Sequence, residues 1–541
     1  MTEKNVYDVI IVGAGIAGTV LGTILARNNV KTLILEGGSH PKFAIGESMI
    51  PATSFMLRLM SERYDVPELV DCSVLPYLND RVSNRCGIKR NFSFVYHREG
   101  MTQDLNEMTQ LPVPIVPYGA EAHLYRQDVD AYYLQLAIKY GAVVKQNTKV
   151  EDIEIKDDGV VVSCGKNTYY GDFLVDGTGY SSVLSKALGN RDEEPRFATN
   201  SRSIFTHMID VPPYDEVSGT HALPSKIHKG TLHHIFDGGW IWVIPFDNHK
   251  DAVNPVCSVG LQLDRTKYPE RGLPPEEEFQ EFISKFPQIA KHFENAKPIR
   301  NWISTGRLQY SSSSVVGDRF CLLAHASAFI DPLFSRGLAI TMETINALSQ
   351  RLIDAAEDGK FTKEKFALVD KIITNSYDVN DRLVSCCYVA FKSFDLWNAF
   401  YRVWALGQAF TSIRLTKLLS EYYAERDVSV LSEVERAPFI GSLVADFDEF
   451  QNLFEEATSI IDLVRDKKID DGEACKRLYA LYDKAYIPPQ YDLANPERKY
   501  IADMSLSSLL EVMEWGAVQA PVNVQGLYFD QTGKNKLLRS A

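Results

Sequence analysis

Residues 8–18 read Asp8-Val9-Ile10-Ile11-Val12-Gly13-Ala14-Gly15-Ile16-Ala17-Gly18, and this stretch decides the fold of the 541-residue chain. The apolar run before Gly13 predicts a buried strand, and the residues after Gly15 predict a helix that continues to about residue 28. A second apolar run follows at 31–35 and ends at Glu36. A strand, a Gly-x-Gly-x-x-Gly turn, a helix and a second strand ending in a carboxylate are together typical of a dinucleotide-binding βαβ unit.

Each position of this turn has a physical reason. Gly13 permits the tight turn, Gly15 lets backbone amides approach a pyrophosphate, and Gly18 lets the helix pack on the sheet. The positive end of the helix favours the anion, and Glu36 is spaced to bind a ribose hydroxyl. An isolated glycine turn would need neither the second strand nor the carboxylate. The predicted nucleotide-binding residues are therefore Gly13, Gly15, Ile16, Ala17, Gly18 and Glu36.

The composition narrows the class of protein. Hydrophobic residues make up 45% and charged residues 24% of the chain, which is ordinary for a globular protein. The formal net charge of -14 argues against partners such as nucleic acid or an anionic membrane. We find no signal peptide and no apolar run long enough to span a bilayer, so we expect a cytoplasmic protein. The eight cysteines lack metal-binding or CxxC spacing, which predicts a reducing compartment and no metal site.

Hydrophobic periodicity predicts an α/β protein with three regions. These are a discontinuous nucleotide-binding domain (1–195, completed by 301–360), a β-rich segment on the substrate side (196–300) and a helical C-terminal region (361–541). Within the last region, aromatic residues recur every three or four positions from Tyr388 to Trp404. This spacing predicts one helix whose aromatic stripe packs in the core or roofs a pocket.

Three later motifs indicate that the bound dinucleotide is FAD and not NAD. Gly46-Glu47-Ser48 lies just beyond Glu36, Asp176-Gly177-Thr178-Gly179 follows a strand, and Asp331-Pro332 precedes Gly337 and a helix. They resemble motifs of the flavoprotein monooxygenases of the para-hydroxybenzoate hydroxylase type. The resemblance implies an FAD-binding Rossmann-like domain in which the last motif places a helix N-terminus against the flavin. It adds as predicted FAD-binding residues Gly46, Glu47, Ser48, Arg126, Asp176, Asp331 and Gly337. Ala324-His325 stands where that family usually has Gly-Asp, which leaves the side-chain contact from this position open.

A hexapeptide, Trp240-Ile241-Trp242-Val243-Ile244-Pro245, narrows the chemistry. It matches the WxWxIP signature of flavin-dependent halogenases letter for letter. Strand alternation places the two tryptophans on one face and Ile241 and Val243 on the other. Beside a flavin, Trp240 and Trp242 would form a wall that keeps an aromatic substrate away from the flavin and so suppresses hydroxylation. A pair of core tryptophans is the alternative interpretation.

The same resemblance implies a catalytic lysine in a short strand after the Gly-Glu-Ser segment. Lys89 fits this position best, and Arg90 is the alternative if the register shifts by one residue. Alternation predicts two strand faces, with Phe92, Phe94 and Tyr96 on one and Lys89, Asn91 and Ser93 on the other. In this family reduced FAD, dioxygen and halide give hypohalous acid. A lysine can hydrogen-bond that species or form a haloamine, and a lowered lysine pKa suits either role.

The resemblance also implies a halide site at Ser335-Arg336-Gly337, where amides at the start of a helix favour an anion. Family members that act on free tryptophan carry a glutamate at the position of Phe334. Phe334 therefore argues against tryptophan and favours phenols or pyrroles, often bound to a carrier protein or within a peptide. We expect a phenol such as a tyrosine side chain, with Phe334 joining Trp240 and Trp242 in the active-site wall.

The leading hypothesis is a flavin-dependent halogenase of natural-product biosynthesis that uses reduced FAD and chloride or bromide. The chain has one complete dinucleotide fingerprint, and the resemblance implies that a separate flavin reductase supplies the reduced FAD. An aromatic hydroxylase that uses NAD(P)H is one alternative, and it would need neither the paired tryptophans nor Lys89. A flavin-binding protein without turnover is the other, and only Ala324-His325 favours it. The substrate, the halogenated position, the halide preference, the general base and the oligomeric state stay open.

Overall fold

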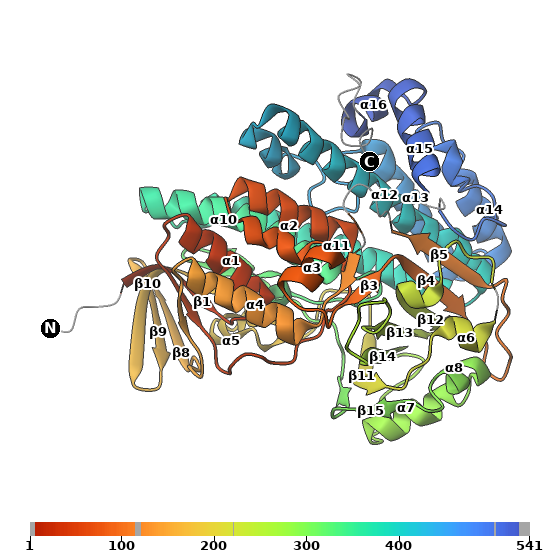
Figure 1. Cartoon of the computed structure of the whole chain (residues 1–541), viewed down its shortest axis with the longest axis horizontal. Coiled ribbons are helices and arrows are strands. Elements are labelled where there is room, and N and C mark those ends of the chain that lie inside the picture. Colours follow the sequence, from red (N-terminus) through yellow and green to blue (C-terminus); the bar gives the residue numbers. More distant parts are fainter. Residues whose placement is uncertain (1–5, 114–118, 120, 220, 502–504, 530–541) are drawn as a thin grey trace.

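The predicted α/β class is confirmed by the computed structural model, which describes residues 6–113, 119, 121–219, 221–501 and 505–529. One large sheet lies on the left of Figure 1, a second lies at the lower right, and the C-terminal helices gather above the second. Segments far apart in sequence build each sheet. The boundaries near residues 195, 300 and 360 stay predictions.

The βαβ unit forms the centre of the first sheet. β1 (Val6–Val12) pairs in parallel with β2 (Thr32–Leu35), and α1 (Ile16–Arg27) connects them. On its other side β1 pairs in parallel with β10 (Asn167–Asp176). The other strands of this sheet are β7 (Val143–Lys145), β8 (Asp152–Lys156), β9 (Gly159–Cys164), β17 (Val316–Gly317) and β18 (Phe320–Leu322). Against α1 pack α4 (Arg126–Lys139) and α10 (Arg336–Asp358). The carboxyl ends of β1, β2 and β10 meet at one edge, where α/β sheets bind ligands.

The second sheet carries the WxWxIP hexapeptide on a central strand. Its strands, in sheet order, are β15 (Lys297–Pro298), β11 (Ser201–Ile209), β14 (Cys257–Asp264), β13 (Gly239–Pro245), β12 (Thr231–Phe236), β4 (Asn91–Tyr96) and β5 (Met108–Pro112), with β16 (Ile303–Ser304) beside β11. On β13, Trp240 and Trp242 join the core shared with the first sheet. Ile241 and Val243 join a separate core with α7 (Pro275–Ile283) and α8 (Pro287–His292), so the predicted alternation is confirmed.

The remaining helices cover the sheets and form the C-terminal region. They are α2 (Pro51–Arg63), α3 (Leu75–Arg81), α5 (Val183–Ala187), α6 (Tyr214–Ser218), α9 (Ala324–Ser327), α11 (Ala367–Ala390), α12 (Phe394–Glu425), α13 (Asp448–Arg465), α14 (Asp471–Leu481), α15 (Leu506–Val518) and α16 (Val522–Tyr528). The prediction of one helix from Tyr388 to Trp404 is wrong, because α11 ends at Ala390 and α12 begins at Phe394. Ser393 is extended and its hydroxyl accepts the amide of Leu396, so it caps a new helix instead of continuing the old one.

Several chemical features of the described ranges bear on function. No helix within them is long and apolar enough to cross a membrane. The same ranges contain no group of three or more His, Cys, Asp or Glu residues placed to hold a metal ion. The eight cysteines are free thiols, and all but Cys475 are buried.

Candidate active site

A cavity of about 810 Å³ opens at the carboxyl edge of the first sheet and reaches the second sheet, and we call it the first cavity. This volume lies within the range of roughly 300–1,000 Å³ that small-molecule and cofactor sites span. Of the predicted site residues it is lined by Gly13, Gly15, Ile16, Ala17, Glu36, Gly46, Glu47, Ser48, Arg126, Trp240, Trp242, Asp331, Ser335 and Gly337. The predicted residues outside its lining are Gly18, Lys89, Phe334, Arg336 and Asp176.

The glycine turn leaves room for a ligand next to the backbone. Gly13 has φ +99°, and a Cβ there would lie 2.7 Å from the carbonyl oxygen of Gly177. A Cβ at Gly15 would meet no atom within 4 Å, so the amides at the start of α1 are open to the cavity. The position of Gly18 is different, because a Cβ there would collide with the carbonyl of Gly13. Gly18 therefore shapes the turn from behind, as its role in packing the helix on the sheet requires, and its place among the nucleotide-binding residues stays a prediction.

Glu36 lies at the end of β2 with both carboxylate oxygens fixed. Oε2 accepts the amide of Ala14 (2.9 Å) and pairs with the Lys42 ammonium (2.6 Å), and Oε1 accepts the amide of Gly38 (2.8 Å). Burial alone would raise the pKa of this carboxyl, but Lys42 and the two amides lower it below its usual value. A charged acceptor thus lines the cavity at the place expected for a ribose hydroxyl.

Asp176 supports the cavity from inside the protein. Its carboxylate accepts the amide and hydroxyl of Thr178 (2.8 and 2.6 Å) and the amide of Leu184 (2.8 Å). Burial raises the pKa of Asp176, and these donors oppose that rise. Asp176 lies outside the cavity lining and fixes the loop of Gly177 and Thr178 that does line it, and its contact with the cofactor stays a prediction.

Two charged residues, Arg126 and Glu47, line the first cavity next to Gly46. Arg126 makes a two-point ion pair with Asp130 (2.7 and 2.9 Å), and its remaining nitrogen donates to the carbonyls of Ile45 (2.7 Å) and Gly46 (3.0 Å). Glu47 Oε1 lies 2.6 Å from His207 Nε2. Glu47 Oε2 is buried and has no hydrogen-bond partner among the residues that the structure describes. Such an orphan acceptor in the wall fits a bound group that carries an N–H or O–H donor, as a flavin ring does.

The loop before α10 is held in a fixed shape by Asp331. The carboxylate accepts the amide of Leu333 (3.0 Å), the Tyr388 hydroxyl (2.9 Å) and both Ser201 and Gln262 side chains (3.1 Å each). Burial raises the pKa of Asp331 to about 6 against these donors. The carboxylate is therefore occupied by protein donors, although the residue lines the cavity as predicted.

His325 occupies the position where the resemblance left the contact open. Its ring lines the first cavity, and a Cβ at Gly337 would lie 2.7 Å from its Nε2. Burial, together with the charge of Arg126, lowers the pKa of His325 to about 4. A neutral imidazole thus packs on the first turn of α10, and only glycine fits opposite it. Ser335, with φ +53°, turns the chain into this helix.

The two tryptophans form one wall of the first cavity as predicted. Their rings lie 5.9 Å apart between centroids. His233 on β12 was not predicted, and it continues the wall at 5.3 Å from Trp240 and 4.6 Å from Phe94. Burial and the nearby Lys89 lower the pKa of His233 to about 3, so the ring is neutral. His233 belongs to no sequence motif, so sequence reasoning had no signal by which to find it.

Lys89 lies behind this cavity, on β3 (Gly87–Lys89), which pairs with β6 (Glu121–His123) in a small separate sheet. The residue is completely buried. Its Nζ donates to Ser48 Oγ (2.5 Å) and to the carbonyl of Met49 (2.6 Å), and it lies 3.4 Å from the centroid of the Phe92 ring. Burial lowers the pKa of Lys89 well below its usual range, and the charge of Glu121 on the paired strand partly opposes this.

The faces predicted for the segment from Lys89 to Tyr96 are partly wrong. The chain changes sheet at Arg90, whose amide donates to the carbonyl of Lys229 (2.8 Å), so Lys89 is not on a strand continuous with Phe92. The lysine therefore contacts the Phe92 ring that alternation placed on the opposite face. Asn91 and Ser93 do share a polar face, since the Ser93 hydroxyl donates to Asn91 Oδ1 (2.8 Å).

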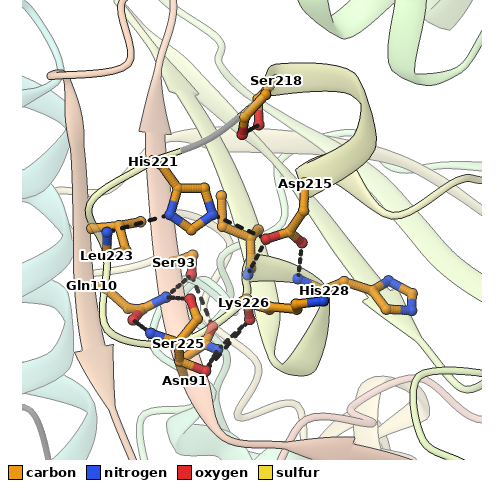
Figure 2. A network of polar contacts seen from close by, with 12 residues as sticks. Asn91, Ser93, Gln110, Asp215, Ser218, His221, Leu223, Ser225, Lys226 and His228 are labelled. Carbon is orange, nitrogen blue, oxygen red and sulfur yellow. Dashed lines mark hydrogen bonds and ion pairs between the residues drawn. The ribbon is translucent and has the colours of Figure 1, made fainter.

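That polar face anchors the segment that leads into β12, as Figure 2 shows. Gln110 donates to Ser93 Oγ and to the carbonyl of Ser225 (2.9 Å each), and Asn91 donates to the carbonyl of Lys226 (2.9 Å). Asp215 accepts the amides of Ile227 (3.0 Å) and His228 (2.9 Å) beside it. The network fixes the start of β12, and with it Thr231 and His233.

A directed chain of hydrogen bonds orients the amine of Lys89. His123 Nδ1 lies 2.9 Å from the Pro245 carbonyl, which can only accept, so Nδ1 carries the proton. Burial and Lys89 lower the pKa of His123 to about 3, so its Nε2 is an acceptor, and the Thr231 hydroxyl (2.9 Å) donates to it. The Ser48 hydroxyl then donates to Thr231 (2.9 Å) and presents a lone pair to Lys89. The last residue of the WxWxIP hexapeptide thus fixes the acceptor of the lysine. Sequence reasoning missed His123 and Thr231, which belong to no motif.

A second cavity, of about 180 Å³, lies among α2, α10 and α12. Its lining includes Ile50, Arg336, Gln408 and Thr411. Phe334 does not line either cavity, because it stacks on Trp404 at 4.3 Å. The residues of the predicted halide loop therefore line two different cavities. Ser335 and Gly337 line the first cavity, while the Arg336 side chain lines the second, so Arg336 can serve a halide in the first cavity only through its backbone.

Comparisons with known proteins agree with this geometry. Residues 105–407 match the family model described as tryptophan halogenase. The chain is 41% identical to the monodechloroaminopyrrolnitrin halogenase PrnC of Pseudomonas fluorescens, over 99% of this chain and 96% of the relative. It is 39% identical to the tetracycline 7-halogenase of Kitasatospora aureofaciens, over 94% of this chain and 92% of the relative. The crystal structure of the halogenase PltM in complex with phloroglucinol and FAD superposes with a TM-score of 0.88 at 38% identity, covering 92% of this chain and 99% of that one.

The chain therefore belongs to the flavin-dependent halogenase family. It is a halogenase that uses FAD and halide, and the predicted family, FAD-binding fold and cofactors are confirmed. The hydroxylase and the flavin-binding protein without turnover are set aside. The roles of individual site residues stay predictions, which the geometry above makes specific.

Proposed function

We propose that this halogenase acts on a phenol or a similarly electron-rich ring, with Lys89 as the amine that delivers the halogen. The single observation that carries the proposal is the position of Lys89, which is completely buried and is held by the Met49 carbonyl and by Ser48, a residue that lines the first cavity. When bound in the first cavity, reduced FAD with dioxygen and halide supplies hypohalous acid. The residues Gly13, Gly15 and Glu36 would hold the nucleotide part, and Gly46, Glu47, Ser48 and Gly337 would line the flavin.

The chain's own residues then direct the reagent. Trp240 and Trp242 bar an aromatic ring from the first cavity, so only a small species passes toward Lys89. The backbone at Ser335 and Gly337, at the positive end of α10, favours the halide. The Lys89 ammonium hydrogen-bonds hypohalous acid, or the neutral amine takes its halogen to form a haloamine and releases water, and the lowered pKa makes the neutral amine accessible.

The aromatic residues around Phe334 favour a substrate ring that is already activated by an electron-donating group. Phe334 stacks on Trp404, and Trp404 also meets Phe92 edge to face at 5.1 Å. An apolar wall supplies no carboxylate to assist an unreactive indole carbon, so the ring must bring its own electron-donating group. Support comes from PltM, which was crystallised with phloroglucinol, a phenol, and from PrnC and the tetracycline halogenase, whose names specify other aromatic substrates.

Two further parts of the proposal concern partners. A separate flavin reductase would supply reduced FAD, because the sequence has one complete dinucleotide fingerprint, used for FAD. A substrate tethered to a carrier protein or peptide is a second possibility for delivery. It is supported by a relative 26% identical over 68% of this chain, a chlorinase named for pyrrole-2-carbonyl on a peptidyl-carrier protein. A cytoplasmic location stays a prediction.

The test is an incubation of the enzyme with FAD, NADH, bromide and a panel of phenols, pyrroles and tyrosine peptides, with and without a generic flavin reductase. We expect products with the bromine isotope doublet, only when the reductase is present, and phenols to lead the panel. Pyrroles alone as substrates would refute the phenol proposal, and product formation without the reductase would refute the need for that partner. A mass gain of one oxygen would indicate that hypohalous acid does not reach the ring.

A further inference from the structure

The amine nitrogen of Lys89 makes two hydrogen bonds and has one position left. Besides its bond to Cε, the nitrogen has three tetrahedral positions, and Nζ donates from two of them, to Ser48 Oγ (2.5 Å) and to the Met49 carbonyl (2.6 Å). In the ammonium the third position holds an N–H, and in the neutral amine it holds the lone pair. Taking a halogen from hypohalous acid requires that this lone pair is not already hydrogen-bonded.

Ser48 is the neighbour that decides whether the lone pair is free. The Met49 carbonyl can only accept, and the Phe92 ring, whose centroid lies 3.4 Å from Nζ, has no proton to give. The Ser48 hydroxyl can both accept and donate. If its proton turned toward Nζ, it would hydrogen-bond the lone pair of the neutral amine and block the nucleophile.

A count of protons shows that the Ser48 hydroxyl points its proton away from the amine. His123 Nδ1 carries a proton, because it lies 2.9 Å from the Pro245 carbonyl, so Nε2 of the neutral ring accepts. The single proton of the Thr231 hydroxyl goes to that Nε2 (2.9 Å), and the single proton of Ser48 goes to Thr231 (2.9 Å). No hydroxyl proton is left for Nζ. Reversing the chain would set the Nδ1 lone pair against the carbonyl oxygen, which is unfavourable.

The backbone holds the members of this chain in place. Ser48 and His123 form an antiparallel bridge, and Thr231 begins β12 in register with Phe92 on β4. The side chains of all three members are buried. Ser48 and Thr231 also line the first cavity, so the two hydroxyls lie between the space for the cofactor and the amine.

The charges around the chain keep His123 neutral. Burial and the charge of Lys89 lower the pKa of His123 to about 3, and the nearby His228 and His233 act in the same direction. Glu121 lies opposite Lys89 in the pairing of β3 with β6, and its charge partly opposes the fall in the pKa of Lys89 that burial causes. The His123 Nε2 therefore stays an acceptor across the pH range in which Lys89 can lose its proton.

We propose that His123 and Thr231 are positioning residues for halogen delivery, which direct the Ser48 proton away from Lys89 and so keep the amine lone pair free. The inference rests on the proposed function. The lone pair attacks the halogen of hypohalous acid, the nitrogen–halogen bond forms, and the halogen–oxygen bond breaks with its electron pair on oxygen. The proton that nitrogen then loses joins this oxygen, and water leaves. The aromatic ring takes the halogen from nitrogen, and the proton displaced from the ring restores the amine.

Thr231→Val tests the proposal because it removes the acceptor of the Ser48 proton at nearly constant volume. The freed proton can donate to the neutral amine but not to the ammonium, so it stabilises the neutral form. A hydrogen bond of ordinary strength corresponds to a pKa shift of about half a unit to one unit. We expect the pKa of Lys89 to fall by that amount, measured by NMR titration of the FAD-loaded enzyme with ¹³Cε-labelled lysine. The Lys89 signal is identified by its loss in Lys89→Met.

Two control variants separate this effect from general damage. Thr231→Ser keeps the hydroxyl and should keep the wild-type pKa of Lys89. Thr344→Val removes another completely buried hydroxyl, which donates to the Ile340 carbonyl (2.7 Å) and lines neither cavity, and it should leave that pKa unchanged. An unchanged or raised pKa in Thr231→Val, or the same fall in Thr231→Ser, would overturn the proposal.

A double variant tests whether His123 acts through Thr231. His123→Met removes the acceptor of the Thr231 proton, which lets the chain reverse, so it should reproduce the fall in the pKa of Lys89. Residues that act through one chain are not additive, and we expect the pair of changes to lower this pKa no further than Thr231→Val alone. Additive falls would show two independent disturbances and would contradict the proposal.

Turnover gives a second readout and separates the inference from the proposed function. With phloroglucinol as the probe, we expect Thr231→Val to lower brominated product per oxygen consumed by about twofold to tenfold, with an unchanged KM for the phenol. A raised KM with an unchanged product ratio would overturn the inference. Undiminished bromination in Lys89→Met would reject the proposed function, whatever the titration shows. Loss of bromination in Lys89→Met, with an unchanged pKa of Lys89 in Thr231→Val, would reject the inference alone.

Discussion

Replacing Lys89 with methionine should separate halogen delivery from flavin chemistry. The change keeps most of the side-chain volume and removes the amine, together with its hydrogen bonds to Ser48 (2.5 Å) and the Met49 carbonyl (2.6 Å). Each of these bonds contributes about 1–3 kcal/mol, but burying the amine is unfavourable, and its lowered pKa records that. The two effects oppose each other, so we expect the variant to fold with a stability within about 2 kcal/mol of the wild type.

The effect on catalysis should be far larger. A positioned acid, base or nucleophile typically contributes 10²–10⁴-fold, so we expect halogenated product to fall by about that factor. The first cavity, which Lys89 does not line, keeps its walls. Flavin oxidation should therefore continue at close to the wild-type rate, and hypohalous acid should escape.

The assay compares brominated product, counted by mass spectrometry, with oxygen uptake in the same reaction. Arg90→Met is the matched control, because Arg90 is the adjacent cation, is exposed, and hydrogen-bonds through its backbone to the Lys229 carbonyl and the Val113 amide (2.8 Å each). We expect that variant to lose less than about twofold in product. Undiminished bromination in Lys89→Met, or an equal loss in both variants, would refute the reasoning. An equal fall in oxygen uptake would move Lys89 to cofactor binding.

Three further predictions use other parts of the molecule. Glu121→Gln removes the charge that raises the pKa of Lys89, so the pH profile of halogenation, but not of flavin oxidation, should shift to lower pH. Gly337→Ala places a Cβ 2.7 Å from His325 Nε2 and should weaken FAD binding about tenfold by fluorescence titration, with His325→Ala in the same chain restoring it. His292 is buried with its pKa lowered to about 4, so it binds its proton more readily when unfolded, and stability falls as pH drops below about 6.5. Between pH 7.5 and 5.5 His292→Gln should therefore lose about 1.4 kcal/mol less unfolding free energy than the wild type in denaturant titrations, and equal losses would contradict this.

The fold was predictable where the signal is local. β1, α1 and β2 follow from adjacent residues, and the glycine turn needs only its own geometry. The alternation of Trp240 and Ile241 held because β13 is one uninterrupted strand with a buried core on each face. In each case the sequence period and the structural period coincide over the whole element.

The predictions were wrong where a predicted strand or helix is interrupted. Counting by two from Lys89 to Phe92 assumes one strand, but the backbone at Arg90 leaves the small sheet and joins β12 through Lys229. Counting by three or four from Tyr388 assumes one helix, but Ser393 caps a new one. Neither interruption carries a proline or a glycine, which are the strongest breaking signals, so the count passes through it.

The residues that sequence reasoning missed share a different property. Thr231 and His123 act on Lys89 only through a hydrogen-bond chain that joins strands of two sheets, and Ser48 reaches it from a third segment. No spacing along the chain relates such residues. Only the assembled fold shows that the Pro245 carbonyl decides the tautomer of His123 and so the acceptor of the amine.

Single short segments of the chain supply residues to both cavities. Ser48 lines the first cavity and Ile50 the second, and Gly337 and Arg336 repeat this pattern at the start of α10. Each segment supplies consecutive or alternate residues to different cavities, so the backbone, and not flexible side chains, sets the separation between the two cavities. Lys89 contacts one of these segments through Ser48 and Met49. Ser48 thus lies between the first cavity and the amine, which is the separation that delivery of a small oxidant to Lys89 requires.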